Sequence, residues 1–400
     1  MPDVRAVLER CDVLARCSEE PGRLTRRFAT PALAEARGLV AGWMREAGLE
    51  PRTDAVGNLI GRRDGPGPTL LLGSHLDSVR DAGRFDGPLG VLLALAAAQR
   101  VRERPLPFAL EVVAFADEEG VRYGTAFLGS ALLAGRFEAA WLERRDADGV
   151  AMADAIRGWG GDPAAVGGPA RDDLLGYLEV HIEQGPVLGD EELPVGVVEA
   201  IAGQTRASVT FAGAAAHAGT TPMTARRDAL GAAAEWIGAV EAAGRGTAGL
   251  VATVGELDVD PGAANVVPGR VVASLDARHA DDGARKDAVR ALRERANAIG
   301  AARGVEVGWE DVQATAAVRC DPDLTDHLAG IAAAVTRARV PRLASGAGHD
   351  AVMLSTVTPV AMLFVRCERG ISHHPAEAVR AEDVAVALDV TTRLLEELAA

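Results

Sequence analysis

Histidines and carboxylates recur beside the short apolar runs of this chain, and both residue types bind divalent metals. His75 and Asp77 follow the run 69–73 and point to the same side of an extended chain. A histidine that binds a metal through one ring nitrogen needs an acceptor for its other N–H, and a carboxylate two residues away can supply it. The alternative for this segment alone is a surface ion pair.

Two further acidic segments lie next to apolar runs. Asp86 stands in a Phe-Asp-Gly turn before an apolar stretch, where it could reach a ligand cleft or cap the helix that follows. The run 109–116 ends in Asp117, Glu118 and Glu119, which repel one another unless a cation neutralises them or water solvates them. Gly120 permits a turn there, so one of the two glutamates can bind a metal while the other stays a free base.

His181 and His373 belong to two more segments of this kind, one on the run 178–182 and one in a loop before the last helix. Asp, Glu and His donors without nearby thiols suit zinc, manganese, cobalt or nickel in a catalytic site, and not a cysteine-type structural zinc. Because five such segments rarely arise together, the sequence predicts a metal site.

The elements that must position these residues are short and buried. The runs 69–73, 109–116 and 178–182 are typical of strands covered on both faces, and the Leu- and Ala-rich stretch 87–104 favours a helix between the first two. Residues 31–48 have the apolar spacing of a helix. Strand, helix, strand in this order predicts an α/β layer.

The middle of the chain has a different rhythm. It predicts strands at 206–211, 250–254, 270–277 and 305–309 and helices at 222–243 and 282–303, which is the β-α-β-β-α-β order of a ferredoxin-like unit. Helices at 324–338 and 382–398 and a strand at 360–364 follow. We therefore expect a discontinuous catalytic domain, 1–204 and 322–400, interrupted by an inserted domain, 205–321.

Composition narrows the possible partners. The 400 residues carry a formal net charge of −15, which disfavours nucleic acid and anionic membranes as partners. No apolar run approaches the ~20 residues of a membrane helix, and the charged N-terminus lacks the apolar core of a secretory signal. Four cysteines form no C-x-x-C pair, so we expect reduced thiols in a cytoplasmic protein.

Eight motifs in one order give the chain a family resemblance. It resembles the N-carbamoyl-L-amino-acid hydrolase, allantoate amidohydrolase and β-ureidopropionase group of the dinuclear-metal M20 peptidase clan over roughly residues 5–395. His-Ile-Glu-Gln-Gly-Pro (181–186) separates this group from the aminoacylases and dipeptidases of the clan. The other motifs are Gly-Ser-His-x-Asp-Ser-Val (73–79), Gly-x-Phe-Asp-Gly (83–87), Glu-Glu-Gly (118–120), Ala-His-Ala-Gly-Thr-Thr-Pro-Met (216–223), Asn-Val-Val-Pro-Gly (265–269), Ser-Gly-Ala-Gly-His-Asp-Ala (345–351) and Ile-Ser-His (371–373).

The resemblance implies two divalent metal ions per subunit, zinc first, with manganese, cobalt or nickel as alternatives. Asp86 would bridge them. His75 and His181 would complete one site, and Glu119 and His373 the other.

It also implies that Glu118 is the general base and that Asp77 orients His75. His374 departs from the family pattern, and the place of His373 after Ile371-Ser372 favours His373 as the ligand.

Two residues of the insert have plain alternatives. His217 could be a helix cap or a surface residue, and Arg278 could form an ordinary ion pair with Asp276. The resemblance instead implies that His217 stabilises the oxyanion in the partner subunit's site and that Arg278 clamps the substrate carboxylate.

The remaining substrate contacts also follow from the resemblance. The side-chain amides of Gln184 and Asn265 would bind the carboxylate end of the substrate, and the backbone at Gly346 and Gly348 would approach it. We expect His349 and Asp350 to support the metal ligands from behind, and His279 and His327 to be structural.

The implied fold is a mixed-sheet, metallopeptidase-like α/β catalytic domain with an inserted ferredoxin-like α+β domain that serves as lid and dimerises the protein. The implied function is hydrolysis of the ureido C–N bond of a small carboxylate substrate, allantoate or an N-carbamoyl-L-amino acid, by a homodimer. An aminoacylase or dipeptidase of the same clan and a catalytically silent binding protein are the alternatives. The silent protein predicts a lost base or ligand, yet Glu118 and every expected ligand are present.

Overall fold

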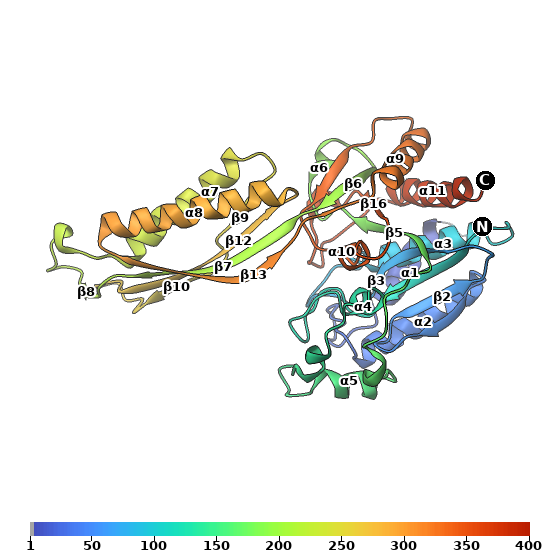
Figure 1. Ribbon diagram of the computed structural model, residues 1–400, viewed down its shortest axis with the longest axis horizontal. Helices are drawn as coiled ribbons and strands as arrows, with labels where there is room; N and C mark the ends of the chain where they lie inside the picture. The colour runs from blue at the N-terminus through green and yellow to red at the C-terminus, as the bar shows by residue number, and fades with distance from the viewer. Residues whose placement is uncertain (1–3) are drawn as a thin grey trace. The chain divides into compact units, whose positions relative to one another are not determined.

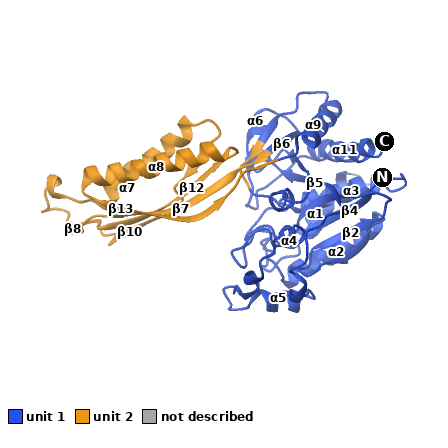
Figure 2. Cartoon of the chain, viewed as in Figure 1, with its two compact units in different colours: residues 1–199, 320–343, 348–400 blue, residues 200–319, 344–347 orange. Residues whose placement is uncertain are grey.

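The computed structural model describes residues 4–400, which divide into two compact units (Figure 1, Figure 2). Unit 1 runs to Glu199 and resumes over 320–343 and 348–400, whereas unit 2 contains 200–319 and 344–347. The short segment 344–347, which the sequence places outside the insert, clusters with unit 2. One reason is that the Ser345 carbonyl accepts a hydrogen bond of 2.8 Å from the Ala202 amide.

Unit 1 is built on a mixed sheet, in agreement with the expected fold class. The strand order is β1-β2-β4-β3-β5-β16-β6, with β14 and β15 both paired to β6. The neighbours β4-β3-β5-β16 are parallel, and the pairings β1-β2, β2-β4, β16-β6 and β14-β6 are antiparallel. The strands are β1 (Glu50–Thr53), β2 (Leu59–Arg63), β3 (Thr69–His75), β4 (Ala109–Phe115), β5 (Leu174–Ile182), β6 (Val195–Ile201), β14 (Val318–Arg319), β15 (Arg342–Ser345) and β16 (Val360–Val365).

The predicted helix between the first two buried strands is α3 (Pro88–Arg100), and every residue from Pro88 to Ala98 is buried. It contacts β3, β4 and β5, and also α1 (Val4–Leu14) and α11 (Ala381–Leu398). The helix lies very close to the sheet at Gly90, where an added Cβ would stand 2.0 Å from the Val180 carbonyl oxygen. A fully apolar helix is stable here because both of its sides are covered.

The other helices of unit 1 surround the sheet. The helix α2 begins after Thr30, whose hydroxyl accepts a hydrogen bond from the Leu33 amide. All four cysteines are free and buried, as expected for reduced thiols. Across residues 4–400, none of the helices combines the length and the apolar character that a membrane span requires. The helices are α2 (Pro31–Glu46), α4 (Leu128–Leu133), α5 (Met152–Gly158), α6 (Val187–Asp190), α9 (Pro322–Thr336) and α10 (Ala351–Leu354).

Unit 2 is an antiparallel sheet with two helices on one face (Figure 2). The strand order is β10-β12-β7-β13, and β9 also pairs with β12. Alternate residues of β7 and β12 are buried under α7 and α8, so the opposite face of the sheet carries the polar side chains. The elements are β7 (Gly203–Ala212), β8 (Ala216–His217), α7 (Ala229–Gly246), β9 (Val251–Thr253), β10 (Leu257–Asp260), β11 (Val266–Val267), β12 (Arg270–His279), α8 (Asp282–Arg303) and β13 (Glu306–Thr315).

One helix boundary of unit 2 is wrong in the sequence analysis. The helix expected from residue 222 begins at Ala229, after a short 3-10 turn at Met223–Ala225. Asp228 is the N-cap, because its side chain accepts a hydrogen bond from the Gly231 amide. The proline at position 222 therefore precedes a turn, and an aspartate six residues later starts the helix.

Candidate metal centre and substrate contacts

Asp86 lies at the centre of a cluster of histidines in unit 1. It stands in the turn after β3 and is 3% exposed. Its Oδ1 atom is 3.1 Å from His181 Nε2 and 3.7 Å from His75 Nε2. His75 ends β3 and His181 lies near the end of the parallel neighbour β5, so the sheet delivers both rings to one edge.

The second oxygen of Asp86 faces a different set of donors. His373 Nε2 lies 3.1 Å from Asp86 Oδ2 and 3.4 Å from Glu119 Oε1. Nitrogen and oxygen atoms of His75, Asp86 and His181 form one group that could hold a metal, and those of Asp86, Glu119 and His373 form another. Asp86 is thus common to both groups, and each of its oxygens faces one of them.

Asp77 contacts both the first histidine of the cluster and the turn that carries the two glutamates. Its carboxylate accepts hydrogen bonds of 3.0 Å from the Glu118 amide and 3.1 Å from the Glu119 amide. The same residue lies beside His75, whose Nδ1 is 3.1 Å from the Asp77 carbonyl oxygen and 3.3 Å from its Oδ1. The carboxylate therefore holds the turn that carries both glutamates next to the first histidine.

Burial and crowding shift the ionisation of this cluster. Burial and then Asp86 raise the pKa of Glu119 to about 7. Burial and the neighbouring Glu119 also raise the pKa of Glu118 well above its usual range. Asp86 behaves in the opposite way: burial favours its neutral form, but hydrogen bonds with His181, His373 and His75 outweigh it and hold the pKa well below 3.8.

The donor set fits divalent cations. Buried carboxylates that raise one another's pKa are costly unless positive charge compensates them, and histidines are the neighbours that lower the pKa of Glu118 and Glu119. One group offers two histidine nitrogens and a carboxylate oxygen, and the other offers one histidine nitrogen and two carboxylates. Both sets match the ligands of catalytic zinc and its first-row relatives.

Glu377 and Ser372 support the cluster, and the sequence analysis assigned no role to either. One oxygen of Glu377 accepts hydrogen bonds from the backbone amides of Phe85, at 2.7 Å, and Asp86, at 3.1 Å. Its other oxygen accepts a hydrogen bond of 3.1 Å from the Ser372 hydroxyl. A buried carboxylate thus joins the Asp86 turn to the loop of His373. The only signal in the sequence is an acidic residue shortly after His-Pro.

His349 and Asp350 lie behind the first group. The ring of His349 is buried, and its centroid is 4.6 Å from that of His181. Asp350 is buried as well and accepts a hydrogen bond of 2.5 Å from the Ser130 hydroxyl. Neither residue belongs to the two groups around Asp86, but His349 forms a third group that could hold a metal, with His181 and Glu179.

The remaining residues that the sequence analysis named lie in different parts of the structure. Gln184 donates its side-chain N–H to Asp86 Oδ2 at 3.0 Å and so lies in the cluster. Gly348 is close to the base, because a Cβ added there would be 3.8 Å from Glu118 Oε1. His217 and Asn265 meet in unit 2, where β8 pairs with β11 and the Asn265 carbonyl accepts a hydrogen bond from the Ala218 amide.

Two expected structural histidines and the ambiguous His374 lie outside the cluster. His279 Nε2 is 2.9 Å from the Ala248 carbonyl oxygen, and His327 Nε2 is 2.9 Å from a Glu397 oxygen. His374 Nδ1 accepts a hydrogen bond from the backbone amide of Ala376. Of the two adjacent histidines, His373 is therefore the one that faces Asp86.

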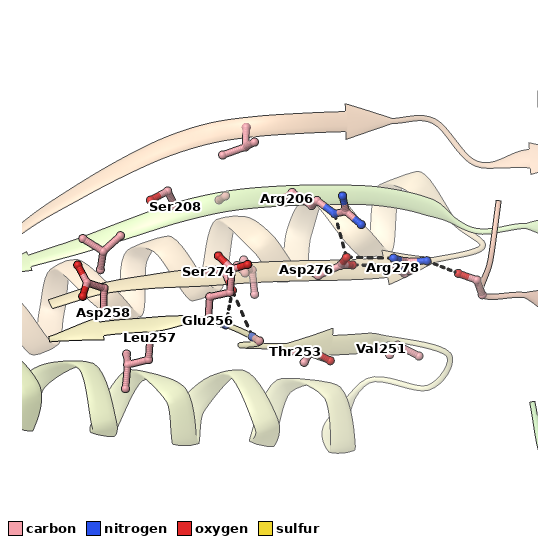
Figure 3. A pocket seen from close by; sticks show the side chains of 16 residues that line it. Arg206, Ser208, Val251, Thr253, Glu256, Leu257, Asp258, Ser274, Asp276 and Arg278 are labelled. Atoms are coloured by element: carbon pink, nitrogen blue, oxygen red, sulfur yellow. Dashed lines mark hydrogen bonds and ion pairs between the residues drawn. The ribbon is translucent and has the colours of Figure 1, made fainter. Parts of the chain in front are cut away.

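Arg278 lies on the polar face of the unit 2 sheet, in the wall of a cavity of about 1030 Å³ (Figure 3). Its Nε and Nη2 atoms donate to the two oxygens of Asp276 at 2.9 and 3.0 Å. Nη1 donates to the Gly346 carbonyl oxygen at 2.8 Å. The structure thus brings together two residues expected to bind substrate, Arg278 and Gly346, and shows the ion pair that was the alternative for Arg278.

The fold and the cluster define a class. A mixed sheet that gathers histidine and carboxylate donors at the carboxyl edge of its parallel strands is the architecture of a metal-dependent hydrolase. The chain belongs to the peptidase family M20/M25/M40, whose model matches residues 71–397.

Individual relatives agree with this family. The chain is 42% identical over 394 residues to an N-carbamoyl-L-amino acid amidohydrolase of Geobacillus stearothermophilus, with 96% of each sequence covered. It is 39% identical to allantoate deiminase 1 of Glycine max, with 96% of this chain and 87% of the relative covered. A crystal structure of a hydantoinase/carbamoylase family amidase from Burkholderia multivorans matches with a TM-score of 0.92 at 34% identity, covering 99% of this chain and 98% of the other.

Proposed function

We propose that this protein hydrolyses the ureido C–N bond of a small substrate that carries a carboxylate, allantoate or an N-carbamoyl-L-amino acid, and releases ammonia and carbon dioxide. The observation that carries the proposal is the position of Asp86 between two groups of metal-binding donors, with Glu118 beside them. The names of the two relatives support a carbamoyl or ureido substrate.

The metal centre of this proposal has two divalent ions, zinc first and manganese, cobalt or nickel otherwise. His75 and His181 would hold one ion, Glu119 and His373 the other, and Asp86 both. When bound, two such ions lower the pKa of a shared water and polarise the carbonyl that it attacks. Asp77 keeps His75 and the two glutamates in register by accepting the Glu118 and Glu119 amides.

Glu118 is the proton carrier in this scheme. Its side chain is only 8% exposed, and its raised pKa reflects burial and the nearby Glu119. A carboxyl group with a raised pKa can take a proton from water and return it to the leaving nitrogen. Gly348 lies beside Glu118 and the Phe127 ring, since a Cβ added there would be 3.8 Å from Glu118 Oε1 and 2.7 Å from Phe127 Cζ.

The proposal also assigns residues that contact the substrate. Arg278 binds the carboxylate of the substrate, because a guanidinium matches a carboxylate with two parallel hydrogen bonds. The side-chain amide of Gln184, which already donates one hydrogen bond to Asp86, binds the same end of the substrate. Asn265 and the backbone at Gly346 complete the carboxylate end, and His217 stabilises the oxyanion in the site of a partner subunit.

Unit 2 is, in this proposal, a ferredoxin-like lid that also forms the homodimer. The order β7-α7-β9-β12-α8-β13 and the two helices on one face of the sheet support it. A cytoplasmic location agrees with the four buried free thiols.

A substrate panel tests the function. Protein reconstituted with zinc or manganese would be assayed for ammonia release from allantoate and from several N-carbamoyl-L-amino acids, and for amine release from N-acetyl amino acids and dipeptides. We expect turnover of at least one ureido acid and little of the amides. Turnover of amides alone would favour an aminoacylase or dipeptidase, and bound metal without any turnover would favour a silent binding protein.

A further inference from the structure

Asp276 organises the polar face of the unit 2 sheet. It lies on β12 directly opposite Arg206 of β7, and it accepts hydrogen bonds from three side chains. Gln204 donates at 2.7 Å, Arg206 Nε at 3.1 Å, and Arg278 through two nitrogens at 2.9 and 3.0 Å. Figure 3 shows Arg206, Asp276 and Arg278 side by side along the cavity wall.

The contacts of Arg278 leave a defined part of its guanidinium available. An arginine has five N–H bonds in a planar fork. Asp276 takes Nε–H and one N–H of Nη2, and the Gly346 carbonyl takes one N–H of Nη1. One N–H on each terminal nitrogen therefore remains, which is the number that a bidentate carboxylate accepts.

The charge of the group still favours an anion. Asp276 neutralises one guanidinium, but Arg206 and Arg278 share it, so the three side chains keep one net positive charge. The side chain of Asp276 is 27% exposed and that of Arg206 49% exposed, so the trio lines the cavity and is not part of the core. A long arginine side chain loses conformational entropy when it binds a ligand. Hydrogen bonds that already hold the side chain in place reduce this entropic cost of binding.

We propose that Asp276 is a positioning residue: it fixes the Arg278 guanidinium, with Gly346, so that the two remaining N–H bonds receive the substrate carboxylate. The inference rests on the proposed function, in which Arg278 binds that carboxylate. Asp276 itself does not touch the substrate. Arg206, held by the same carboxylate, adds a second positive charge beside Arg278, on a cavity wall that also carries Glu256 and Asp258.

The test compares Asp276→Asn with Arg278→Lys, and uses Asp258→Asn as the matched control. Asp258 lines the same cavity, so its variant also removes one negative charge there, but it makes no contact with Arg278. Each metal-loaded variant would be assayed with an N-carbamoyl-L-amino acid and with the corresponding carboxamide. Circular dichroism and metal content would verify folding.

We expect Asp276→Asn to raise KM for the acid about tenfold with little change in kcat, because the lost interaction acts on binding. Its ratio of kcat/KM between acid and amide should fall as it does in Arg278→Lys, and the double variant should lose little more than Arg278→Lys alone. Asp276→Glu, which keeps the charge, should retain more of the ratio. Asp258→Asn should keep the preference for the acid over the amide, because it leaves the hydrogen bonds of Arg278 with Asp276 and Gly346 intact.

The same comparison can be made without turnover. Each variant would be combined with Glu118→Gln, and the binding of the same acid and amide would be measured by calorimetry. If Asp276→Asn keeps the preference for the acid while Arg278→Lys loses it, the inference about Asp276 is overturned and the carboxylate clamp stands. If Arg278→Lys also keeps the preference, the clamp itself is wrong, and the inference fails with it. Absence of turnover in the unsubstituted protein, despite binding, would instead contradict the proposed reaction.

Discussion

Glu118 and Glu119 are adjacent in the sequence, yet they face different surroundings. Glu119 lies 3.4 Å from His373, whereas Glu118 has no place in either group of metal donors. We expect Glu118→Gln to retain its metal and lose ~10²–10⁴-fold in turnover, because the proton carrier is gone. Glu119→Gln should weaken metal retention. Metal analysis after dialysis, together with kcat, would distinguish them, and equal metal content with equal residual activity would contradict both roles.

Metal binding should release protons. In the metal-free protein His373 has a pKa of about 9 and Glu119 of about 7, so at pH 7 the histidine is protonated and the glutamate about half so. Metal binding needs both groups unprotonated, so the apparent affinity should increase as pH rises from about 6 to about 9. Calorimetry in buffers of different ionisation enthalpy would measure the protons released by these two groups and by His75 and His181, where burial lowers the pKa but hydrogen bonds with Asp77 and Asp86 outweigh it and raise the pKa.

The matched variants for this prediction are the two adjacent histidines. His373→Gln should lower both the affinity and the number of protons released, whereas His374→Gln should change neither. The opposite result would transfer the ligand role to His374.

The residues of the metal-binding cluster were easier to predict from the sequence than the residues that hold them in place. His75, Asp86, His181, Glu119 and His373 were all named, because their types and the family motifs mark them. The role of Glu377 was missed, since a single carboxylate carries no pattern and its partners include two backbone amides nearly 300 residues away. Distant pairing of that kind depends on the tertiary fold, which local spacing does not encode.

At the scale of elements, the turn between β3 and α3 sets the position of the first histidine. Gly87 has φ +81°, and a Cβ built there would lie 2.6 Å from the His75 ring. Gly87→Ala should therefore cost ~1–3 kcal/mol of stability and weaken metal retention. Thermal unfolding and metal content would measure both.

Gly42→Ala is the control for that variant. Gly42 lies within α2 and has nothing within 4 Å of an added Cβ, so alanine should be neutral or stabilise by up to ~1 kcal/mol. If Gly87→Ala behaved like Gly42→Ala, the close contact with His75 would have no consequence for the site.

The elements themselves were mostly predictable where a pattern was strong. The helix 282–303 coincides with α8, whose start is marked by Asp281 as N-cap and whose end is marked by Gly304. Several strands were missed, β6 and β10 among them. Leu257–Asp260 is short and largely exposed, so it has no apolar signal, and β6 has a nearly continuous apolar pattern that does not by itself distinguish strand from helix.

For the whole molecule, the proposed dimer predicts complementation. His217 is exposed on β8 of unit 2 and belongs to none of the groups of metal donors within residues 4–400, and in the proposal it acts in the partner's site. Glu118→Gln and His217→Ala proteins should each be nearly inactive. Mixed and allowed to exchange subunits, they should regain part of the activity, because one site of the mixed dimer receives both intact residues.

Subunit exchange must be verified independently, for example by native mass spectrometry of differently tagged chains. A fully active monomer, or no recovery of activity after exchange has been demonstrated, would contradict the shared site.

The position of β16 has a consequence for biosynthesis. This strand lies between β5 and β6, although all of unit 2 separates it from both in the order of translation. While the ribosome makes unit 2, β5 and β6 must therefore wait with unpaired edges, which are the parts of a sheet most prone to aggregation. His373 follows β16, so the nascent chain acquires its full set of metal donors only after the sheet can close. A chain that ends before β16 would have neither a closed sheet nor a complete set of donors.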